Sequence, residues 1–509
     1  MIRLQELIRT HWSLLAITLV AASLRFWDLD RVGFNSDEAV YAGQAAALAG
    51  DPSKAEFFSV FRAHPLLVQF LISLVYRFGV SELGGRAVVA ALGTLTVTAL
   101  YSLCLLMYSR RIALIASLTL ALLPYHILVS RQVLLDAALG FFLVTTMICL
   151  LKYSNSGKLT WAYAFGSSAA LAVLSKEVGI IIIPVIILFL KSRTMLRLRP
   201  LLAGTVGFLL TVAPFPLSLF LGGGTGKASF IVTWQLSRPA NHTWLFYPVA
   251  LFPYFDIVAL LAVAGVVMAL VRRTSPDILL LLWLGITFGF FQLWPVKGFH
   301  YLAPIAPVLC VLAARVFDLP WPRIVGLSLP RVEGLRIERL FALFLVFLGA
   351  SSLFLAYTSS FVLAQQLRPL AGLSGLQGGR ELGIWIQQNT PEGAVFLTIG
   401  PTMANLIQFY GEREAFGLSV SPNPLRRNPS YTPIRNPDYE IRTGKIHYLV
   451  WDIYSATRSQ YFENRLMGYL EKYSSFQVHT ISLETSGVGS TDGRAEIIRL
   501  YRVFGVLGT

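Results

Sequence analysis

Two neighbouring carboxylates, Asp37 and Glu38, lie in the segment FNSDEAVYAGQAA, residues 34–46, directly after the first apolar run of the chain. Such a pair is either a solvated helix start or part of a chemical site. Ser36 and Asp37 are predicted to cap a helix over residues 39–49, because side-chain oxygens at a cap accept hydrogen bonds from free backbone N–H groups. Capping and catalysis are compatible, so the other polar residues decide between the two interpretations.

The rest of the chain is strongly apolar. Its 509 residues are 55% hydrophobic and 14% charged, with a mean hydropathy of +0.63, whereas soluble proteins carry roughly a quarter charged residues. Repeated apolar runs approach the ~20 residues needed to cross a bilayer. The sequence therefore predicts a polytopic α-helical membrane protein. Its formal charge of +15 is concentrated in short loops, which favours positive-inside topology over nucleic-acid binding.

The apolar runs predict about eleven transmembrane helices. Their expected positions are 11–27, 86–108, 111–129, 134–151, 159–175, 178–191, 198–221, 246–271, 277–294, 300–317 and 338–362. Short basic connections alternate with longer polar ones. By the positive-inside rule the N-terminus is cytoplasmic, while the first loop, 28–85, and everything after 363 lie outside an inner or plasma membrane. Residues 66–78 are expected to lie along the interface, since a crossing there would reverse every later loop.

The tail has a different composition. From Gln365 onward it carries 14 basic and 12 acidic residues, an ordinary soluble balance. We predict a transmembrane domain over 1–363 and an extracytoplasmic α/β domain over 364–509. The apolar and polar patterns predict helices at 380–389 and 461–473 and strands at 394–399, 446–452 and 495–503. No disulfide or cysteine metal site is predicted, because all three cysteines fall in apolar runs: Cys104, Cys149 and Cys310.

A set of polar side chains maps to the predicted outer loops and outer span ends. Its members are Asp37, Glu38, His64, Arg131, Asp136, Lys176, Glu177, Arg238, His242, Lys297, His300 and Tyr301. Ionisable residues at membrane depth are costly, so each needs a partner or a function. Carboxylates and cations together suit attack on a carbon that bears a phosphate leaving group. A carboxylate accepts the proton of the nucleophile, and cations stabilise the charge on the departing phosphate.

The order of several short motifs resembles the glycosyltransferase C (GT-C) superfamily. The similarity is greatest to the family 39-like branch, which holds protein O-mannosyltransferases and the aminoarabinose transferase acting on lipid A. It covers about residues 28–310, and the tail resembles the extracytoplasmic domain of bacterial members only in kind. The motifs are SDEAVY (36–41), FRAHPLL (61–67), GGRAVVAALG (84–93), SRQVLLDAAL (130–139), AVLSKEVG (172–179) and WPVKGFHYLAPIAP (294–307).

This resemblance implies a membrane glycosyltransferase. The donor would be a polyprenyl-phosphate sugar, and the acceptor an extracytoplasmic protein, glycolipid or cell-wall glycan, with inversion at the anomeric carbon. It places Asp37 as general base, with Glu38 orienting it or sharing its role. The implied donor-phosphate residues are Lys176, Arg238, Lys297, His300 and Arg131, and the implied substrate-binding or structural residues are His64, Asp136, Glu177, His242 and Tyr301. No cofactor is implied as required and no metal is predicted, although His64 and His242 would be the ligands of one.

Alternative interpretations exist for the function and for single residues. A transporter or flippase of lipid-linked sugars would show repeated halves and binding groups near the membrane midplane, whereas no repeat is visible and the polar residues lie at one face. A sensor would leave the membrane carboxylates unexplained. His64, followed by Pro65, can simply start a helix, and Arg131 can pair with Asp136. The set Lys297, His300 and Tyr301 can serve as interfacial anchors.

Overall fold

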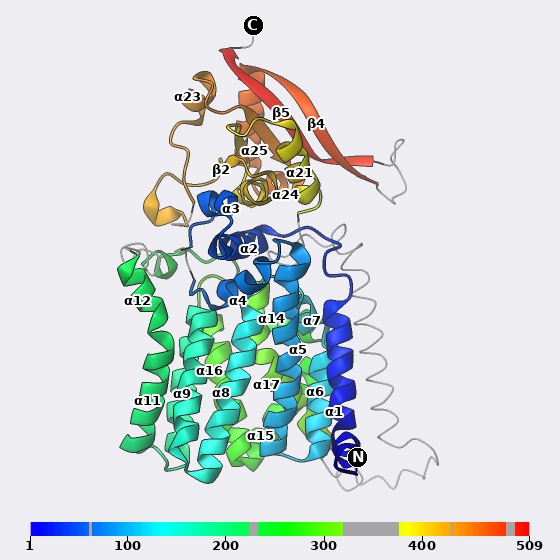
Figure 1. Cartoon of the computed structure of the whole chain (residues 1–509), viewed down its shortest axis with the longest axis vertical. Helices are drawn as coiled ribbons and strands as arrows, with labels where there is room; N and C mark the ends of the chain where they lie inside the picture. Colours follow the sequence, from blue (N-terminus) through cyan, green and yellow to red (C-terminus); the bar gives the residue numbers. More distant parts are fainter. Residues whose placement is uncertain are drawn as a thin grey trace.

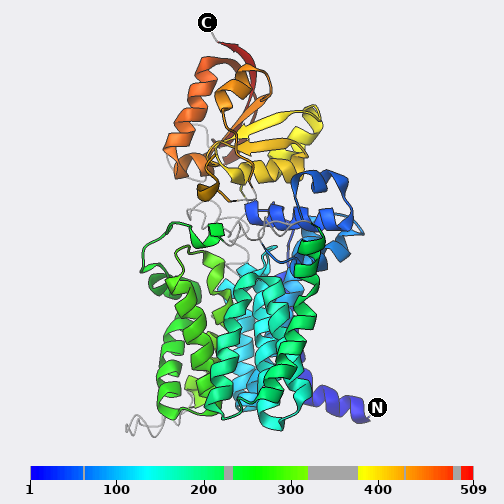
Figure 2. The same cartoon turned by 90° about the vertical axis from the view of Figure 1, so that its left-hand side faces the viewer.

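The computed structural model describes residues 2–60, 64–222, 233–318, 376–428, 431–484 and 494–507. A bundle of helices carries a smaller region with a β-sheet on one of its ends (Figure 1). Helix α1, Ile2–Phe26, begins at the opposite end of the bundle (Figures 1 and 2). The first-loop helices α2 (Ser36–Ala49), α3 (Pro52–Phe57) and α4 (Leu67–Tyr76) lie at the end of the bundle that faces the sheet region (Figure 1), so the segment with the acidic pair is placed where the two parts meet.

The bundle is that of a multi-pass membrane protein. Within the described ranges, four stretches are long and apolar enough to cross a membrane alone, and up to seven if each bent pair is one span. Every predicted span coincides with described helices except 338–362, which lies outside the described residues. After α1, the elements of the bundle are α5 Glu82–Met107, α6 Arg110–Leu122, α7 Pro124–Ser130, α8 Asp136–Ser156, α9 Leu159–Ser175, η1 Glu177–Ile181, α10 Ile182–Ser192, α11 Leu198–Val212, α12 Pro214–Leu221, α14 Phe246–Phe255, α15 Ile257–Arg272, α16 Ser275–Leu293, η2 Phe299–Ile305, α17 Ala306–Arg315 and η3 Val316–Asp318.

Three of the predicted spans are broken rather than straight. The chain bends by 60° between α6 and α7, by 41° between α11 and α12, and by 112° between α14 and α15. Pro124 and Pro214 stand at the first two breaks, where a proline has no N–H to donate and its ring clashes with the preceding turn. Asp256 stands at the third break with a positive φ of 49°. Hydropathy does not register such breaks, because the residues on both sides are apolar.

The first loop folds into α2 Ser36–Ala49, α3 Pro52–Phe57 and α4 Leu67–Tyr76. The cap predicted for α2 is wrong by position: Asn35, not Ser36 or Asp37, accepts from the N–H groups of Asp37 and Glu38, both at 3.0 Å. The N–H of Asn35 donates to Glu38 Oε2 at 3.1 Å, which completes a capping box. The physical reason is that Asn caps as well as Asp does. The consequence is that the Asp37 carboxylate is not used in capping.

The C-terminal region contains a five-stranded mixed sheet of order β2-β1-β3-β5-β4. Strand β1 runs parallel to β2 and β3, and β5 runs antiparallel to β3 and β4. The three predicted strands and two predicted helices are confirmed, while β2 and β4 were not predicted. The elements are α21 Gly379–Asn389, β1 Val395–Thr398, α22 Pro401–Leu406, η4 Ile407–Gly411, β2 Glu414–Gly417, η5 Pro424–Arg426, α23 Pro437–Arg442, β3 Tyr448–Asp452, α24 Ile453–Arg458, α25 Gln460–Lys472, β4 Tyr473–Glu484 and β5 Arg494–Leu507.

The sheet region is docked on the loop that precedes α2. The Phe34 and Phe409 rings meet edge to face, with centroids 5.2 Å apart, inside a shared buried cluster. The Tyr410 hydroxyl accepts the N–H of Phe34 at 2.7 Å and donates to Glu82 at the start of α5. Arg380 donates to the other oxygen of Glu82 at 2.7 Å. The sheet region therefore fixes the approach of the chain to the N-terminus of α2.

A second docking contact joins α3 to Glu412, which directly follows η4, and should depend on pH. Glu412 forms an ion pair with the buried Lys54 and accepts from the Ser53 hydroxyl at 2.9 Å. Burial alone raises the pKa of Glu412, but the hydrogen bond and charge of Lys54 outweigh it and lower the pKa below its ordinary value. The charged form thus stabilises docking above the unfolded-state pKa of about 4.3, and this contribution is lost as the pH falls through the lower folded-state pKa.

We therefore expect amide hydrogen exchange in α3 to accelerate as the pH drops below about 4, after correction for intrinsic exchange rates. Glu412→Gln should show the faster exchange already at neutral pH and should lack the acid-dependent step. Glu392→Gln is the matched control, because Glu392 is exposed and its side chain has no contact among the described residues. An acid step of equal size in Glu412→Gln would show that another group is responsible.

Candidate active site

Asp37 stands open at the N-terminal turn of α2. Its side chain is exposed, and its carboxylate has no hydrogen bond or ion pair among the described residues. The backbone N–H of Asp37 is held by Asn35, so the residue is fixed in place while its carboxylate remains available. Such a carboxylate can accept a proton from a group that comes within hydrogen-bond reach.

Glu38 has the opposite environment. It is 1% exposed, and its two oxygens accept from Arg86 Nε and Nη2, both at 2.8 Å. The N–H groups of Val133 and Asn35 add bonds of 2.9 Å and 3.1 Å. Arg86 also donates to carbonyls of the preceding loop, those of Leu29, Val32 and Gly33. Through Arg86, Glu38 thus ties α2 to α5 and to the loop that leads into α2.

A buried pair of opposite charges lies at the adjoining ends of α8 and α9. Lys176 Nζ donates to both oxygens of Asp136, at 2.9 Å and 3.0 Å, and both residues are buried. The His300 Nε2 atom is 3.8 Å from Asp136 Oδ2, and the Lys176 ammonium lies 4.6 Å from the centroid of the Tyr301 ring. Four residues predicted from three separate motifs therefore form one group.

His64 and Glu177 form a second pair that connects the first loop to η1. His64 Nδ1 lies 2.7 Å from Glu177 Oε2, and the His64 ring packs edge to face against Tyr41, with centroids 5.8 Å apart. Burial raises the pKa of Tyr41 well above its ordinary value, and the negative charges of Asp37, Asp136 and Glu177 raise it further. Tyr41 is therefore within electrostatic range of all three carboxylates, which places Asp37 on the same side as the Asp136–Lys176 group.

Two of the predicted phosphate-binding cations are occupied by backbone carbonyls. Arg131 donates to the carbonyls of Leu24, Arg25 and Asp28, at the end of α1. Lys297 is buried and donates to the carbonyls of Phe291, Gln292 and Trp294, at the end of α16. Cations in these positions satisfy helix C-termini. The structure does not join either side chain to the group around Asp136.

Arg238 and His242 occupy the segment before α14. The Arg238 guanidinium lies over the Trp234 ring at 4.7 Å and donates to Gln235 at 3.2 Å, and it has no carboxylate partner among the described residues. His242 is exposed and stacks on Phe246 at 4.1 Å. No group of three or more His, Cys, Asp or Glu side chains that could hold a metal occurs in the described ranges.

Sequence reasoning left three contributors to this site unassigned: Arg86, Asn35 and Tyr41. Arg86 lies within the quoted motif GGRAVVAALG, and a buried cation at the start of a span was a signal for a carboxylate partner. Asn35 precedes a Glu at the capping-box spacing, which was a second signal. Tyr41 carries no signal beyond its position one helical turn after Asp37.

Comparison with known proteins gives a family for part of the chain and a fold for nearly all of it. The family described as Dolichyl-phosphate-mannose-protein mannosyltransferase matches residues 55–212. ArnT from Cupriavidus metallidurans in the apo state has a TM-score of 0.69 at 15% identity, over 97% of this chain and 98% of that one. The same protein bound to undecaprenyl phosphate gives 0.65 at 16% identity, over 96% and 98%.

A third structure extends the fold to archaea. The oligosaccharyltransferase AglB from Archaeoglobus fulgidus, in complex with an inhibitory peptide and a dolichol-phosphate, has a TM-score of 0.60 at 15% identity, over 96% of this chain and 74% of that one. The comparison with curated protein sequences gives no match. At these identities the structural similarity shows the fold alone, and the matched family supplies the activity. Residues 55–212 thus match the dolichyl-phosphate-mannose-protein mannosyltransferase family, and the chain is a membrane glycosyltransferase with an ArnT-like fold.

Proposed function

We propose that this glycosyltransferase moves a sugar from a polyprenyl-phosphate donor to a hydroxyl group of an extracytoplasmic acceptor, with Asp37 as general base. One observation carries the proposal. Of the two adjacent carboxylates, Glu38 is saturated by Arg86 and backbone N–H groups, while Asp37 is open and lies on the same side as the buried cation Lys176. The undecaprenyl phosphate and dolichol-phosphate bound by the similar structures support a lipid-phosphate donor.

In the proposed reaction the acceptor hydroxyl gives its proton to Asp37 as its oxygen attacks the anomeric carbon. The bond between that carbon and the phosphate oxygen breaks, both electrons leave with the phosphate, and the configuration at the carbon inverts. Polyprenyl phosphate departs as an anion and needs cations more than a proton. Lys176 has three N–H donors, of which Asp136 occupies two, so one remains for a phosphate oxygen. Arg238, which has no carboxylate partner in the described ranges, is the second proposed cation.

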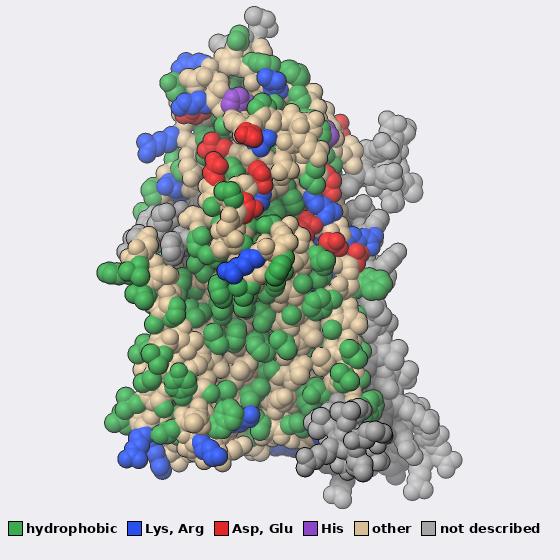
Figure 3. Space-filling view, in the orientation of Figure 1, with side chains coloured by type: hydrophobic (Ala, Val, Ile, Leu, Met, Phe, Trp, Pro, Cys, Tyr) green, Lys and Arg blue, Asp and Glu red, His purple; other side chains and the backbone are tan. Residues whose placement is uncertain are grey.

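The distribution of charge supports the proposed orientation. On the face seen in Figure 3, hydrophobic side chains cover much of the bundle, with Lys and Arg at its far end and Asp and Glu gathered near the junction with the sheet region. Because positive residues mark the cytoplasmic side of membrane proteins, we propose that the far end is cytoplasmic. The open carboxylate, the proposed phosphate cations and the sheet region would then face outside.

The proposed function is tested with the full chain in lipid nanodiscs. A tritium-labelled polyprenyl-phosphate sugar is mixed with a solubilised cell-envelope extract as the source of acceptors. We expect the label to move to glycoprotein or glycolipid and polyprenyl phosphate to accumulate in equal amount. Retention of all label on the donor with every tested sugar would contradict transfer. Movement of intact donor across the bilayer without cleavage would indicate a flippase instead.

The role of Lys176 is tested by binding of undecaprenyl phosphate alone. Lys176→Met combined with Asp136→Asn, which avoids an unpaired buried carboxylate, should weaken binding about tenfold, the effect of one lost charged hydrogen bond. Lys297→Met is the matched control, because its ammonium is occupied by three backbone carbonyls. It should lower the melting temperature and leave the Kd unchanged. Equal losses of affinity in both variants would argue against Lys176 as the phosphate ligand.

A further inference from the structure

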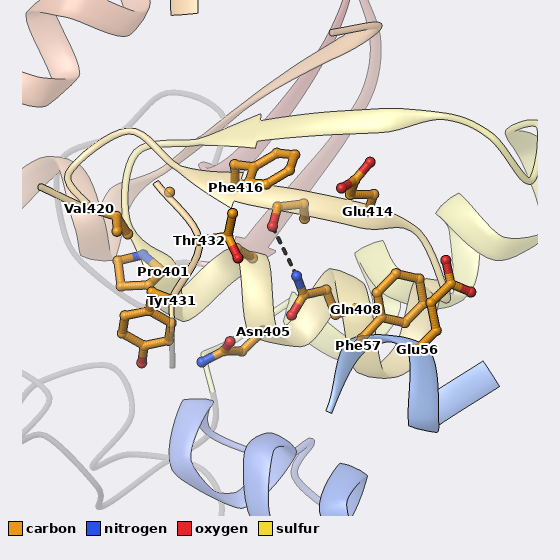
Figure 4. Close-up of a pocket in the computed structure, with 13 residues that line it drawn as sticks. Glu56, Phe57, Pro401, Asn405, Gln408, Glu414, Phe416, Val420, Tyr431 and Thr432 are labelled. Atoms are coloured by element: carbon orange, nitrogen blue, oxygen red, sulfur yellow. Dashed lines mark hydrogen bonds between the residues drawn. The ribbon is translucent and has the colours of Figure 1, made fainter. Parts of the chain in front are cut away.

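A pocket of about 160 Å³ lies between the first loop and the sheet region. Figure 4 shows Glu56 and Phe57 of α3 on one side and Glu414 and Phe416 of β2 on the other. We call it the interdomain pocket. A cavity of about 150 Å³ in another protein accommodates benzene, so this one has room for a group the size of a single ring.

The two side-chain amides that line the interdomain pocket, those of Asn405 and Gln408, present acceptor oxygens, and the hydroxyl groups of Tyr431 and Thr432 also line it. Asn405 is 2% exposed, and its Nδ2 donates to the Ser36 hydroxyl at 2.9 Å, while its Oδ1 has no partner among the described residues. Gln408 likewise donates an N–H of its side-chain amide to the Ala415 carbonyl at 3.0 Å (Figure 4). Its Oε1 also has no partner among the described residues. Both amides have thus used a donor on the protein and offer their oxygens to a ligand.

Two carboxylates complete this acceptor set. Glu56 and Glu414 have no cationic partner in the described part of the chain, and no Lys or Arg is among the residues described as lining the pocket. Burial raises the pKa of Glu414, and the negative charge of Glu56 raises it further, so the two groups are within electrostatic range of each other. A ligand that donates hydrogen bonds and carries positive charge would relieve both the repulsion and the unpaired oxygens.

The interdomain pocket is also linked to the proposed base. Ser36, which receives the Asn405 amide, is the residue directly before Asp37. Phe57 and Phe416 supply flat apolar surface beside the polar atoms. We propose that this pocket binds a primary ammonium group of the acceptor and so holds the acceptor next to Asp37. The inference rests on the proposed function, because it takes the occupant to be part of the substrate that Asp37 deprotonates.

The test measures binding to the full chain in nanodiscs without donor, by saturation-transfer NMR. The probes are glucosamine and lysinamide, each compared with its N-acetylated form, in which the ammonium charge is removed. At least one amine should bind about tenfold more tightly than its acetylated form. Glucosamine as the tighter amine identifies a glycan acceptor, and lysinamide as the tighter amine identifies a protein acceptor; both results support the proposal.

Substitutions in the interdomain pocket test whether the amine probes bind there. Glu56→Gln with Glu414→Gln removes both charges at nearly constant volume and should abolish the preference for the amine. Glu471→Gln, at an exposed residue of α25 without a contact in the described ranges, should keep it. Equal binding of amine and acetylated probes by the unmodified protein overturns the proposal, whether or not the double variant folds. Asp37→Asn should bind the amines normally, so a failure of sugar transfer and a failure of this site give different results.

Discussion

Replacing Asp37 with asparagine should lower the rate of sugar transfer by about 10³-fold, within the range expected for loss of a general base. The asparagine keeps the size of the side chain but cannot accept the proton of the acceptor hydroxyl. The Asp37 carboxylate has no hydrogen bond or ion pair among the described residues, and its backbone N–H is held by Asn35, so the fold should not change. The measurement is single-turnover transfer from a labelled polyprenyl-phosphate sugar, together with the Kd of undecaprenyl phosphate.

The Kd should stay within about twofold of that of the unmodified protein, because the change removes chemistry rather than donor binding. Asp30→Asn is the matched control: it makes the same isosteric change in the same loop, at an exposed side chain without a contact in the described ranges. Its rate should be unaffected. A rate for Asp37→Asn close to that of Asp30→Asn would remove Asp37 from the role of base.

Arg86→Met should destabilise the protein by about 3–5 kcal/mol, the usual result of leaving a buried charge without its partner. Glu38 would keep two backbone N–H donors but lose both bonds from the guanidinium. The loop before α2 would also lose the three carbonyl contacts made by Arg86. Transfer should fall as well, because this loop and α2 hold Asp37. The readouts are the free energy of unfolding in detergent and the single-turnover rate.

A double-mutant cycle separates the ion pair from general damage. Glu38→Met with Arg86→Met replaces both charges by apolar groups, which is often nearly neutral for a buried pair. The double variant should be more stable than Arg86→Met alone, although the loop contacts of Arg86 keep it below the unmodified protein. Simple addition of the two single losses would mean that Glu38 and Arg86 do not stabilise each other.

Local patterns predicted most of the elements. Helix α2, predicted over residues 39–49, and strands β1, β3 and β5 follow from short-range sequence patterns. Strand β2 did not, since its sequence EAFG contains no apolar run, whereas the equally short β1, VFLT, does. The breaks at Pro124 and Asp256 did not, since apolar composition continues across them. Hydropathy thus records which residues prefer lipid, but not where a helix changes direction.

The site was only partly predictable, because the type of a polar residue and its place in the sequence do not reveal which group its side chain contacts in the fold. Asp37 and Glu38 are adjacent in sequence, yet one is open and the other is bound by a guanidinium 48 residues away. Arg131 contacts carbonyls more than 100 residues earlier in the chain, which no local rule anticipates. Lys297 is different: it follows the end of α16 by a few residues, where a cation often caps a helix. That spacing was visible in the sequence.

The contacts between the sheet region and the first loop limit how segments can be exchanged between related enzymes. Tyr410 and Arg380 contact Glu82 and Phe34, and Glu412 contacts Lys54, so both ends of the first loop are matched to one particular sheet region. Exchange of the sheet region between relatives at a boundary near residue 364 would separate these matched surfaces. The first loop and the sheet region therefore form one unit of recombination, although about 300 residues of chain lie between them. Chimaeras designed to change the acceptor should exchange both segments together.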